Sequence, residues 1–442
     1  MSADGLEQIA ARGVDAATAA GAGDAEAYVS DSTGLEVRVF DGEVESLTEA
    51  GQRGLGLRVW IDGRAGYAYG TDLSTDGVTQ IAADAVEAAS VADPDEFAAA
   101  PDPAAAAWST EQRVELAKAI ERAAREADSR VVAVETAVYV DERASVALAN
   151  SRGVAGAYEA TFAYAYLSAI AEDNGDRQTG LGFGMGRSPA ALDADAIGRE
   201  SAERSTSLLG AAKPKSRTCP VVLDPTVAAS FAGFIGGVLC ADAVQRGRSP
   251  FAGMLGEEIA SSVLTLVDDG AEPAGLNSAP FDGEGLPSGR TPLIEDGALG
   301  AYLHDSYTAR REGNGERSTA NASRSGYRSP PSVSTSNLLV EPGAQSLEEL
   351  LADAGEGMYV TDVAGLHSGV NPVSGQFSVG ATGRAISGGE LGQPADEFTI
   401  ASDLQSMLKA IVAAGSEARW VPFGGSVNTP PLLIGEMAIG GA

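Results

Sequence analysis

Histidine and cysteine are scarce in this 442-residue sequence, which limits the chemistry the chain can perform. The two histidines, His304 and His367, lie far apart, whereas a zinc-peptidase motif of the HExxH or HExxxH kind needs two imidazoles on one helix. We therefore expect each histidine to be a surface or core residue rather than a metal ligand. Cys219 and Cys240 are the only cysteines, and neither belongs to a CxxC pair, so buried thiols are expected rather than disulfides.

Basic residues are few as well, and only four of them are lysine. The chain has 30 Lys+Arg against 62 Asp+Glu, a formal net charge of −32, with the acids spread along the sequence. Nucleic-acid binding needs basic patches, and none is visible, so no nucleic-acid partner is expected. A dispersed acidic surface suits a salt-rich, halophilic-like cytoplasm, where ions screen the repulsion between charges. The alternative is an acidic protein that binds cations or basic partners.

Long apolar runs and several familiar catalytic motifs are also missing. No run of 18 apolar residues occurs, and the first residues have no basic or apolar signal-peptide region, so a cytoplasmic protein without a membrane partner is expected. Neither a phosphate-binding P-loop nor a dinucleotide-binding glycine motif is present. The segment Ser323 to Gly326 lacks the first glycine of the G-x-S-x-G turn found in serine hydrolases.

The first 212 residues predict two related α+β units. In the first, residues 1–100, we expect a helix (6–20), a hairpin (25–30 and 35–40, joined by a turn at 31–34), strands at 53–61 and 65–69, and a helix (71–89). The second, residues 104–212, follows a linker at 92–103. Its expected elements are a helix (110–128), strands (131–141, 144–150, 154–167, 177–184) and a helix (193–209). The similar order of elements predicts related layers in one sheet, and the basic link 211–217 marks the next boundary.

Residues 217–442 predict a β-rich domain with a strongly curved or barrel-like sheet. After the apolar strand 219–224, residues 226–250 predict one buried helix, which Asp224-Pro225 would begin. Its interior glycines each cost about 1 kcal/mol relative to alanine, so packing or function must offset them. Further helices are expected at 347–353 and 399–413, and the other apolar segments predict strands. The fold class is α+β: a layered N-terminal α/β region of two units, then the β-rich domain.

Polar residues that could contact a substrate or a partner fall in three places. Asp282 and Glu284, close together in a glycine-rich turn, could meet a cation or a peptide amine, whereas most other acids nearby (Asp268, Asp269, Asp296 and Asp305) are expected on the solvated surface. His304, which follows an expected apolar strand, is a further candidate for such a contact. The polar stretch 308–328 concentrates arginines that could pair with a carboxylate, or it could be a mobile loop. These arginines are Arg310, Arg311, Arg317, Arg324 and Arg328.

Several long segments resemble the TldD/PmbA (TldE) family of metallopeptidases in continuous order. They are DPTVAASFAGFIGGVLCADAVQRGRSPFAGMLGEEIASSVLTLVDDG, FDGEGLPSGRTPLIEDGALGAYLHDSYTARREG and GLHSGVNPVSGQFSVGATGRAISGGEL, with RGLGLRVWIDGRAGYAYGTDL in the first unit. In this family, TldD-like chains carry HExxxH on the helix and a late cysteine ligand. Here Ala232, Gly233 and Gly237 stand at the first histidine, the glutamate and the second histidine, and Gly424-Gly-Ser426 occupies the neighbourhood of the cysteine.

The resemblance therefore implies a PmbA/TldE-type subunit, non-catalytic by itself and without zinc of its own. It implies a heterodimer with a TldD-like partner that holds the zinc and cleaves peptides or unfolded segments. Two alternatives stay open: a peptide-binding scaffold that forms a homodimer, and a hydrolase whose metal-independent site would use Asp282 or Glu284.

Overall fold

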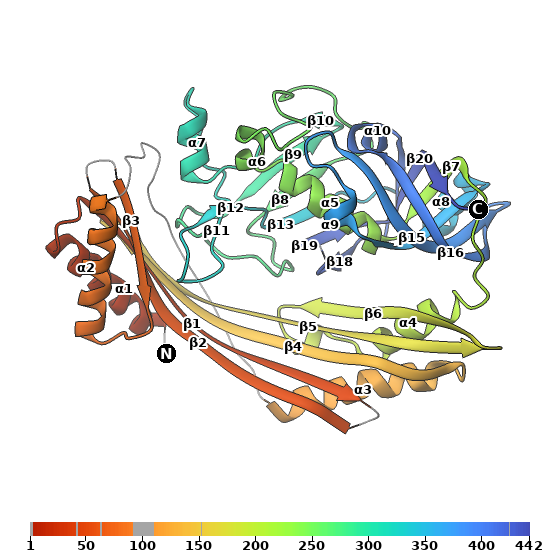
Figure 1. The fold of residues 1–442 in the computed structure, drawn as a ribbon, viewed down its shortest axis with the longest axis horizontal. Helices are drawn as coiled ribbons and strands as arrows, with labels where there is room; N and C mark the ends of the chain where they lie inside the picture. Colours follow the sequence, from red (N-terminus) through yellow and green to blue (C-terminus); the bar gives the residue numbers. More distant parts are fainter. Residues whose placement is uncertain (1–2, 41–42, 62–63, 92–109, 152, 424) are drawn as a thin grey trace.

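One antiparallel sheet built from both N-terminal units forms a long curved base for the rest of the chain (Figure 1). The computed structural model describes residues 3–40, 43–61, 64–91, 110–151, 153–423 and 425–442. The strand order is β3-β2-β1-β4-β5-β6, and the central pair β1–β4 joins the two units. The strands are β1 (Asp24–Phe40), β2 (Glu43–Ile61), β3 (Arg64–Gly70), β4 (Val131–Asn150), β5 (Ala155–Asp173) and β6 (Asp176–Gly186).

Four helices cover one face of this sheet, and the C-terminal domain lies against the other (Figure 1). The helices are α1 (Ala3–Ala19), α2 (Thr75–Val91), α3 (Thr110–Ala127) and α4 (Ala194–Thr206). Side chains alternate between the two faces of a strand. Accordingly, Ala163, Ala165 and Leu167 of β5 are buried with α3 and α4. The alternate positions Phe162, Tyr164 and Tyr166 are only partly buried on the opposite face.

The predicted break at residues 31–34 is wrong, because β1 runs straight through it. Gly34 pairs with Ala50 of β2 on one side and with Glu142 of β4 on the other, so hydrogen-bonded neighbours hold this turn-favouring segment extended. The predicted break between 141 and 144 is wrong for the same reason, since β4 is one strand paired along its length. The hairpin of β2 and β3 is confirmed on either side of residues 62–63. Residues 62–63 and the whole of the expected linker 92–103 lie outside the described residues.

The C-terminal domain contains a closed barrel, which confirms the expected curvature. Its strand order is β16-β15-β14-β7-β20, and Thr399–Ala401 of β16 pairs with 438–440 of β20 to close the ring. The strands are β7 (Arg217–Leu223), β14 (Gly357–Ala364), β15 (Gln376–Ser387), β16 (Glu390–Asp403) and β20 (Leu432–Gly440), with β17 (Ile411–Ala414) attached to β20.

A second sheet of this domain has the order β10-β9-β8-β13-β19-β18. Helix α5 (Pro225–Val238) lies between it and the barrel and contacts strands of both. The sheet strands are β8 (Leu266–Asp269), β9 (Arg290–Glu295), β10 (Ala298–Leu299), β13 (Asn337–Val340), β18 (Arg419–Val421) and β19 (Ser426–Thr429). Shorter elements are η1 (Pro189–Ala191), α6 (Ala241–Gln245), α7 (Ser306–Glu312), β11 (Ala322–Ser323), β12 (Ser332–Val333), α8 (Leu347–Ala354), α9 (Leu366–Gly369) and α10 (Leu404–Lys409).

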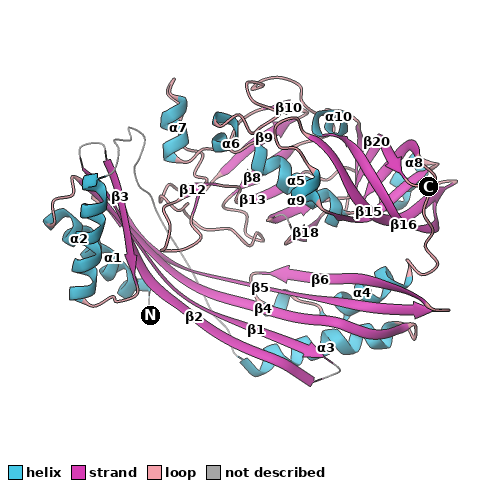
Figure 2. Cartoon of the chain, viewed as in Figure 1, coloured by secondary structure: helices cyan, strands magenta, loops and turns pink. Residues whose placement is uncertain are grey.

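Two predicted helices are shorter than their apolar patterns indicate. The buried helix ends at Val238 instead of 250, because Cys240 leaves the helix to form a parallel bridge with Leu303. In the segment 399–413, only α10 is helical, since Thr399–Asp403 belongs to β16 and 411–414 forms β17. Figure 2 shows how strands dominate both parts of the molecule. In the described ranges, no helix has the length and apolarity needed to cross a membrane.

Candidate functional site

The start of α5 is fixed to the N-terminal region by one buried carboxylate. Asp224 precedes the helix and accepts a hydrogen bond from the Thr226 N–H at 2.9 Å, while Pro225 takes the first helical position. Arg204 of α4 and the hydroxyl of Tyr359 also donate to this carboxylate, at 3.1 and 2.7 Å. Burial by itself raises the pKa of Asp224, but the Arg204 charge and the hydrogen bonds outweigh it and keep the pKa below its ordinary value.

The three motif positions of α5 carry small side chains in different surroundings. Ala232 is buried, Gly233 is half-buried and Gly237 is exposed. A methyl group added at Gly237 would have no atom within 4 Å, whereas one at the neighbouring Gly236 would meet Leu338 at 2.7 Å. Gly236 is therefore needed for close packing against β13. Gly237 has no such packing role, and the helix offers open space at the position of the second histidine.

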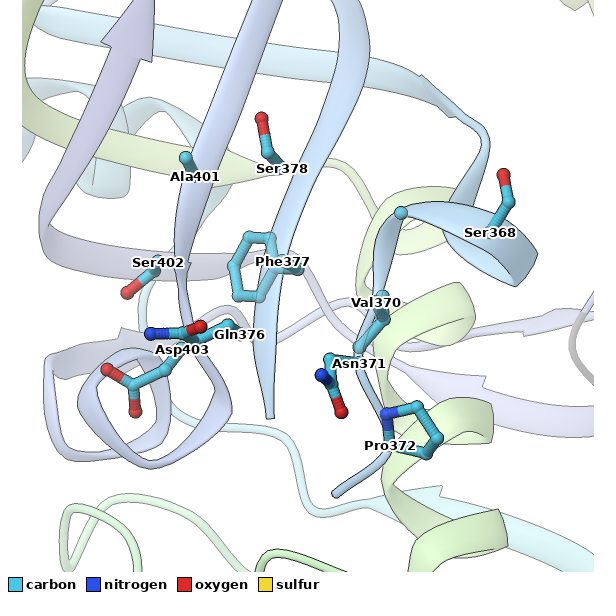
Figure 3. Close-up of a pocket in the computed structure, with 11 residues that line it drawn as sticks. Ser368, Val370, Asn371, Pro372, Gln376, Phe377, Ser378, Ala401, Ser402 and Asp403 are labelled. Atoms are coloured by element: carbon cyan, nitrogen blue, oxygen red, sulfur yellow. The ribbon is translucent and has the colours of Figure 1, made fainter. Parts of the chain in front are cut away.

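A groove of about 880 Å³ lies beside this helix, between residues 368–372 and the paired ends of β15 and β16 (Figure 3). Its Phe377 ring packs on Phe231 of α5, with ring centroids 5.0 Å apart. The carboxamide of Asn371 accepts from the N–H groups of Val373 and Ser374, which fixes the turn at one rim. The other polar residues of the groove are Ser368, Gln376, Ser378, Ser402 and Asp403.

The chemistry available in this groove is hydrogen bonding rather than proton transfer. Asp403 is the one titratable side chain that lines it within the part of the chain the structure describes. Its carboxylate accepts from the Ser406 N–H at 2.9 Å and caps α10. Burial works against ionisation, but the hydrogen bonds at this cap hold the pKa of Asp403 below its ordinary value. A carboxylate held ionised in this way is a poor general acid or base near neutral pH.

Four charged residues from distant parts of the chain form a buried ion network, which we define as Glu26, Arg58, Glu284 and Arg324. Arg58 donates to both Glu26 and Glu284 at 3.1 Å, and Arg324 donates to Glu26. The Arg58 and Arg324 guanidinium groups also lie 4.8 Å from the ring centroids of Trp60 and Tyr28. Burial is the main cause that raises the pKa of Glu284, and Arg58 opposes it. The network joins β1 and β2 to the C-terminal domain.

Sequence reasoning missed half of this network, although Glu26 and Arg58 carried a signal. Each is a charged residue inside an apolar strand, and such residues are seldom buried unless they are paired. Glu284 was singled out for its glycine-rich turn, yet its side chain is 1% exposed and accepts from Arg58 and the Ser306 N–H. Arg324 was expected in a polar loop, but its side chain is 2% exposed.

Two further carboxylates are buried without a cationic partner among the described residues: Asp268, which was expected at the surface, and Asp282, which was expected to meet a cation or a peptide amine. Asp268 accepts from Asn321 Nδ2 and from the Ser336 N–H, and Asp282 accepts from backbone N–H groups of residues 284, 286 and 322. Burial raises the pKa of each to about 7. The surface expectation is also wrong for Asp305, which caps α7 and is 4% exposed. Asp268 and Asp282 hold loop segments in place through these hydrogen bonds, and Asp305 caps a helix.

The remaining candidate contacts are dispersed. His304 is 3% exposed, and burial lowers the pKa of its imidazole. The stretch 308–328 is not one loop, since its start belongs to α7, which carries Arg310 and Arg311 in its last turn. Arg317 is exposed on the turn that follows. His367, the other histidine, lies in α9. A contact of His304 or these arginines with a substrate or a partner stays a prediction.

Comparison with known sequences now identifies the family. Residues 216–441 match the profile of the PmbA/TldA metallopeptidase C-terminal domain, 103–209 that of the central domain and 25–89 that of domain 1. This chain belongs to the PmbA/TldD metallopeptidase family. It is 30% identical over 431 residues to metalloprotease PmbA of Escherichia coli O157:H7, covering 94% of this chain and 92% of that protein. It is also 28% identical to a metalloprotease TldD homolog of Haemophilus influenzae, covering 88% and 87%.

The fold is shared with a solved structure. The crystal structure of TldE from Thermococcus kodakarensis superimposes with a TM-score of 0.85 at 24% identity, covering 97% of this chain and 99% of that one. The likeness extends over both the curved N-terminal sheet and the C-terminal domain.

The residues of this PmbA/TldD family member do not fit the zinc that the metallopeptidase name implies. The side chains at Ala232, Gly233 and Gly237 offer no metal-ligating atom. Among the residues that the structure describes, no group of three His, Cys, Asp or Glu side chains could hold a metal ion. The expectation that zinc belongs to a partner chain stays a prediction.

Proposed function

We propose that this chain is the non-catalytic PmbA/TldE-type subunit of a cytoplasmic heterodimeric protease. Its partner is a TldD-like chain that carries HExxxH and the zinc, and the assembly cleaves peptides or unfolded segments. The observation that carries the proposal is the helix α5, where residues 232, 233 and 237 are Ala, Gly and Gly while the rest of the family fold is retained.

The surroundings of α5 support a structural and binding role for this chain. The helix is tied to both halves of the molecule, through Asp224 at its start and through packing against the barrel and the second sheet. The groove in Figure 3 offers hydroxyl and amide groups beside the helix but little proton-transfer chemistry. Such a surface suits the positioning of a polypeptide whose bond is broken by groups that another chain supplies.

Reconstitution tests the proposal directly. The chain is purified alone, and it is also co-expressed with a TldD-like chain from the same genome that carries HExxxH. We expect no stoichiometric zinc and no cleavage of an unfolded protein by the chain alone, and a stable complex with both properties after co-expression. As a control, the partner with its motif glutamate changed to glutamine should form the complex without cleaving. One tightly bound zinc per isolated chain, or the absence of any complex, would overturn the proposal.

The same preparations separate the two alternatives. A peptide-binding homodimer would have twice the mass of the chain and would not bind the HExxxH chain. A metal-independent hydrolase would keep its activity in chelator and lose it in Asp282→Asn or Glu284→Gln. The geometry supports this last function least, because the Glu284 carboxylate is bound to Arg58 and the Asp282 carboxylate accepts three backbone N–H groups.

A further inference from the structure

A partly enclosed pocket of about 290 Å³ lies where the N-terminal sheet meets the C-terminal domain. Tyr28 of β1 and Tyr158 of β5 form its wall on the sheet side. Loops of the C-terminal domain around Phe281 and Asn321 form the opposite wall. Figure 1 shows the β11–β12 segment of that domain next to the strands of the sheet. The pocket is separate from the groove beside α5, because the two share no lining residue.

The hydroxyl groups of the two tyrosines make no hydrogen bond within the described part of the chain. Tyr28 is 8% exposed, yet among the described residues neither its hydroxyl nor that of Tyr158 has a hydrogen-bond partner. Tyr158 is only partly buried, and neither hydroxyl oxygen is among the buried side-chain atoms without a partner, so both reach the open space of the pocket. Burial raises the pKa of both phenols, so each keeps its proton and is available as a donor at any physiological pH. Two donors that line one cavity and bind no acceptor of the described residues can both donate to a ligand that enters it.

The charged groups of the pocket are already engaged. Arg324 donates to Glu26, to the Gly283 carbonyl at 2.7 Å and to the Ser329 carbonyl at 3.4 Å. Asp282 accepts three backbone N–H groups. Two of the lining serine hydroxyl groups, those of Ser278 and Ser336, are engaged with Asn337 and Asn321, whereas four other lining hydroxyl groups make no side-chain hydrogen bond within the described residues. These four belong to Ser288, Ser323, Ser334 and Thr335.

The pocket therefore presents a largely neutral set of hydroxyl groups on an aromatic and aliphatic frame. The Phe281 ring packs edge-on against Tyr158 with centroids 4.9 Å apart, and Leu276 and Ala279 add apolar surface. A neutral ligand with carbonyl acceptors, N–H donors and small apolar groups matches this lining. The volume corresponds to about ten water molecules, which is the size of one or two amino-acid residues.

We propose that this pocket binds a neutral segment of one or two peptide residues, with Tyr28 and Tyr158 donating to peptide carbonyl groups. The proposal rests on the proposed function for its substrate class, and it adds a second contact for the polypeptide away from α5. A saccharide is the competing class, because it would also use the hydroxyl groups.

The test uses the full chain and N-acetyl-alanine-N′-methylamide as the probe. We expect saturable binding by NMR titration, with probe density in the pocket of a soaked crystal. The double variant Tyr28→Phe/Tyr158→Phe keeps the rings and should weaken binding about tenfold or more, because two hydrogen bonds are lost. The matched control is Tyr69→Phe, whose side chain is 54% exposed and outside the pocket; it should bind as the wild type does.

Three results would overturn the proposal. They are no saturable binding by the wild-type chain, unchanged binding by a double variant that melts as the wild type does, and binding of glucose in place of the peptide probe. If the double variant does not fold, the crystal soak of the wild type decides, since probe density away from the two hydroxyl groups refutes the proposal. The proposed function can fail separately. If the chain binds the probe but forms no complex with a HExxxH chain, the heterodimer proposal is refuted and the pocket proposal stands.

Discussion

Arg58 offers the sharpest test of how the two halves of this protein are held together. Its guanidinium lies 3.1 Å from both Glu26 and Glu284, and its side chain is 9% exposed. The change Arg58→Met keeps much of the side-chain length next to Trp60 but removes the charge. Glu26 would still have Arg324, whereas among the described residues Glu284 would keep only the Ser306 N–H at 2.7 Å.

The expected loss in the free energy of unfolding is about 3–5 kcal/mol at pH 7.5, since an unpaired carboxylate would be left buried. The loss should shrink at pH 5.5. Without Arg58 the pKa of Glu284 rises further, so the folded state binds a proton that the unfolded state does not, and stability increases as the pH falls. Urea unfolding followed by tryptophan fluorescence at the two pH values measures both effects.

The matched control is Arg290→Met, because Arg290 pairs with Glu341 at a similar distance, 2.7 Å, but both side chains are 52% exposed. An exposed pair contributes at most about 1 kcal/mol. If Arg58→Met costs no more than Arg290→Met, or if its cost is the same at both pH values, the argument from burial is refuted.

Two further predictions concern the glycines of α5 and a buried carboxylate. Gly236→Ala should destabilise the protein by about 1–2 kcal/mol, because the added methyl meets Leu338 at 2.7 Å, whereas Gly237→Ala should be neutral or stabilising by up to about 1 kcal/mol. Thermal unfolding of the pair tests this, and equal effects would contradict it. The pKa of Asp268 is about 7 in the fold, so this group destabilises the protein as the pH rises toward 7. Between pH 5 and 8, wild type should lose about 3 kcal/mol relative to Asp268→Asn in urea unfolding, and parallel pH profiles would contradict this.

Local patterns predicted most elements of the fold, and the errors occur where distant segments intervene. The turn signal at 31–34 was overridden by two neighbouring strands, one of which begins about a hundred residues later. The helix after Pro225 was predicted correctly at its start, where the cap is local. Its end was not, because the bridge from Cys240 to Leu303 depends on tertiary contact. Likewise, 399–403 has a helical apolar pattern but completes a barrel with β20.

The candidate site, too, could be predicted from the sequence only where its features are local. The small residues at 232, 233 and 237 are visible in the sequence, because they are defined by a motif with fixed spacing. The ion network and the tyrosine pocket are not, since Glu26 and Arg324 meet across almost three hundred residues of chain. Composition predicted that most acids lie on the solvated surface in a protein of net charge −32, and only packing reveals which of them are buried.

The closure of the barrel has a consequence for synthesis on the ribosome. β7 and β20 are direct neighbours, yet about two hundred residues separate them in the chain. At typical elongation rates of about 5–20 residues per second, roughly 10–40 seconds pass between the synthesis of β7 and that of β20. During that time, its apolar residues and one backbone edge have no β20 to cover them. The nascent C-terminal domain is therefore expected to depend on chaperones while it is made, and the N-terminal sheet can form well before it.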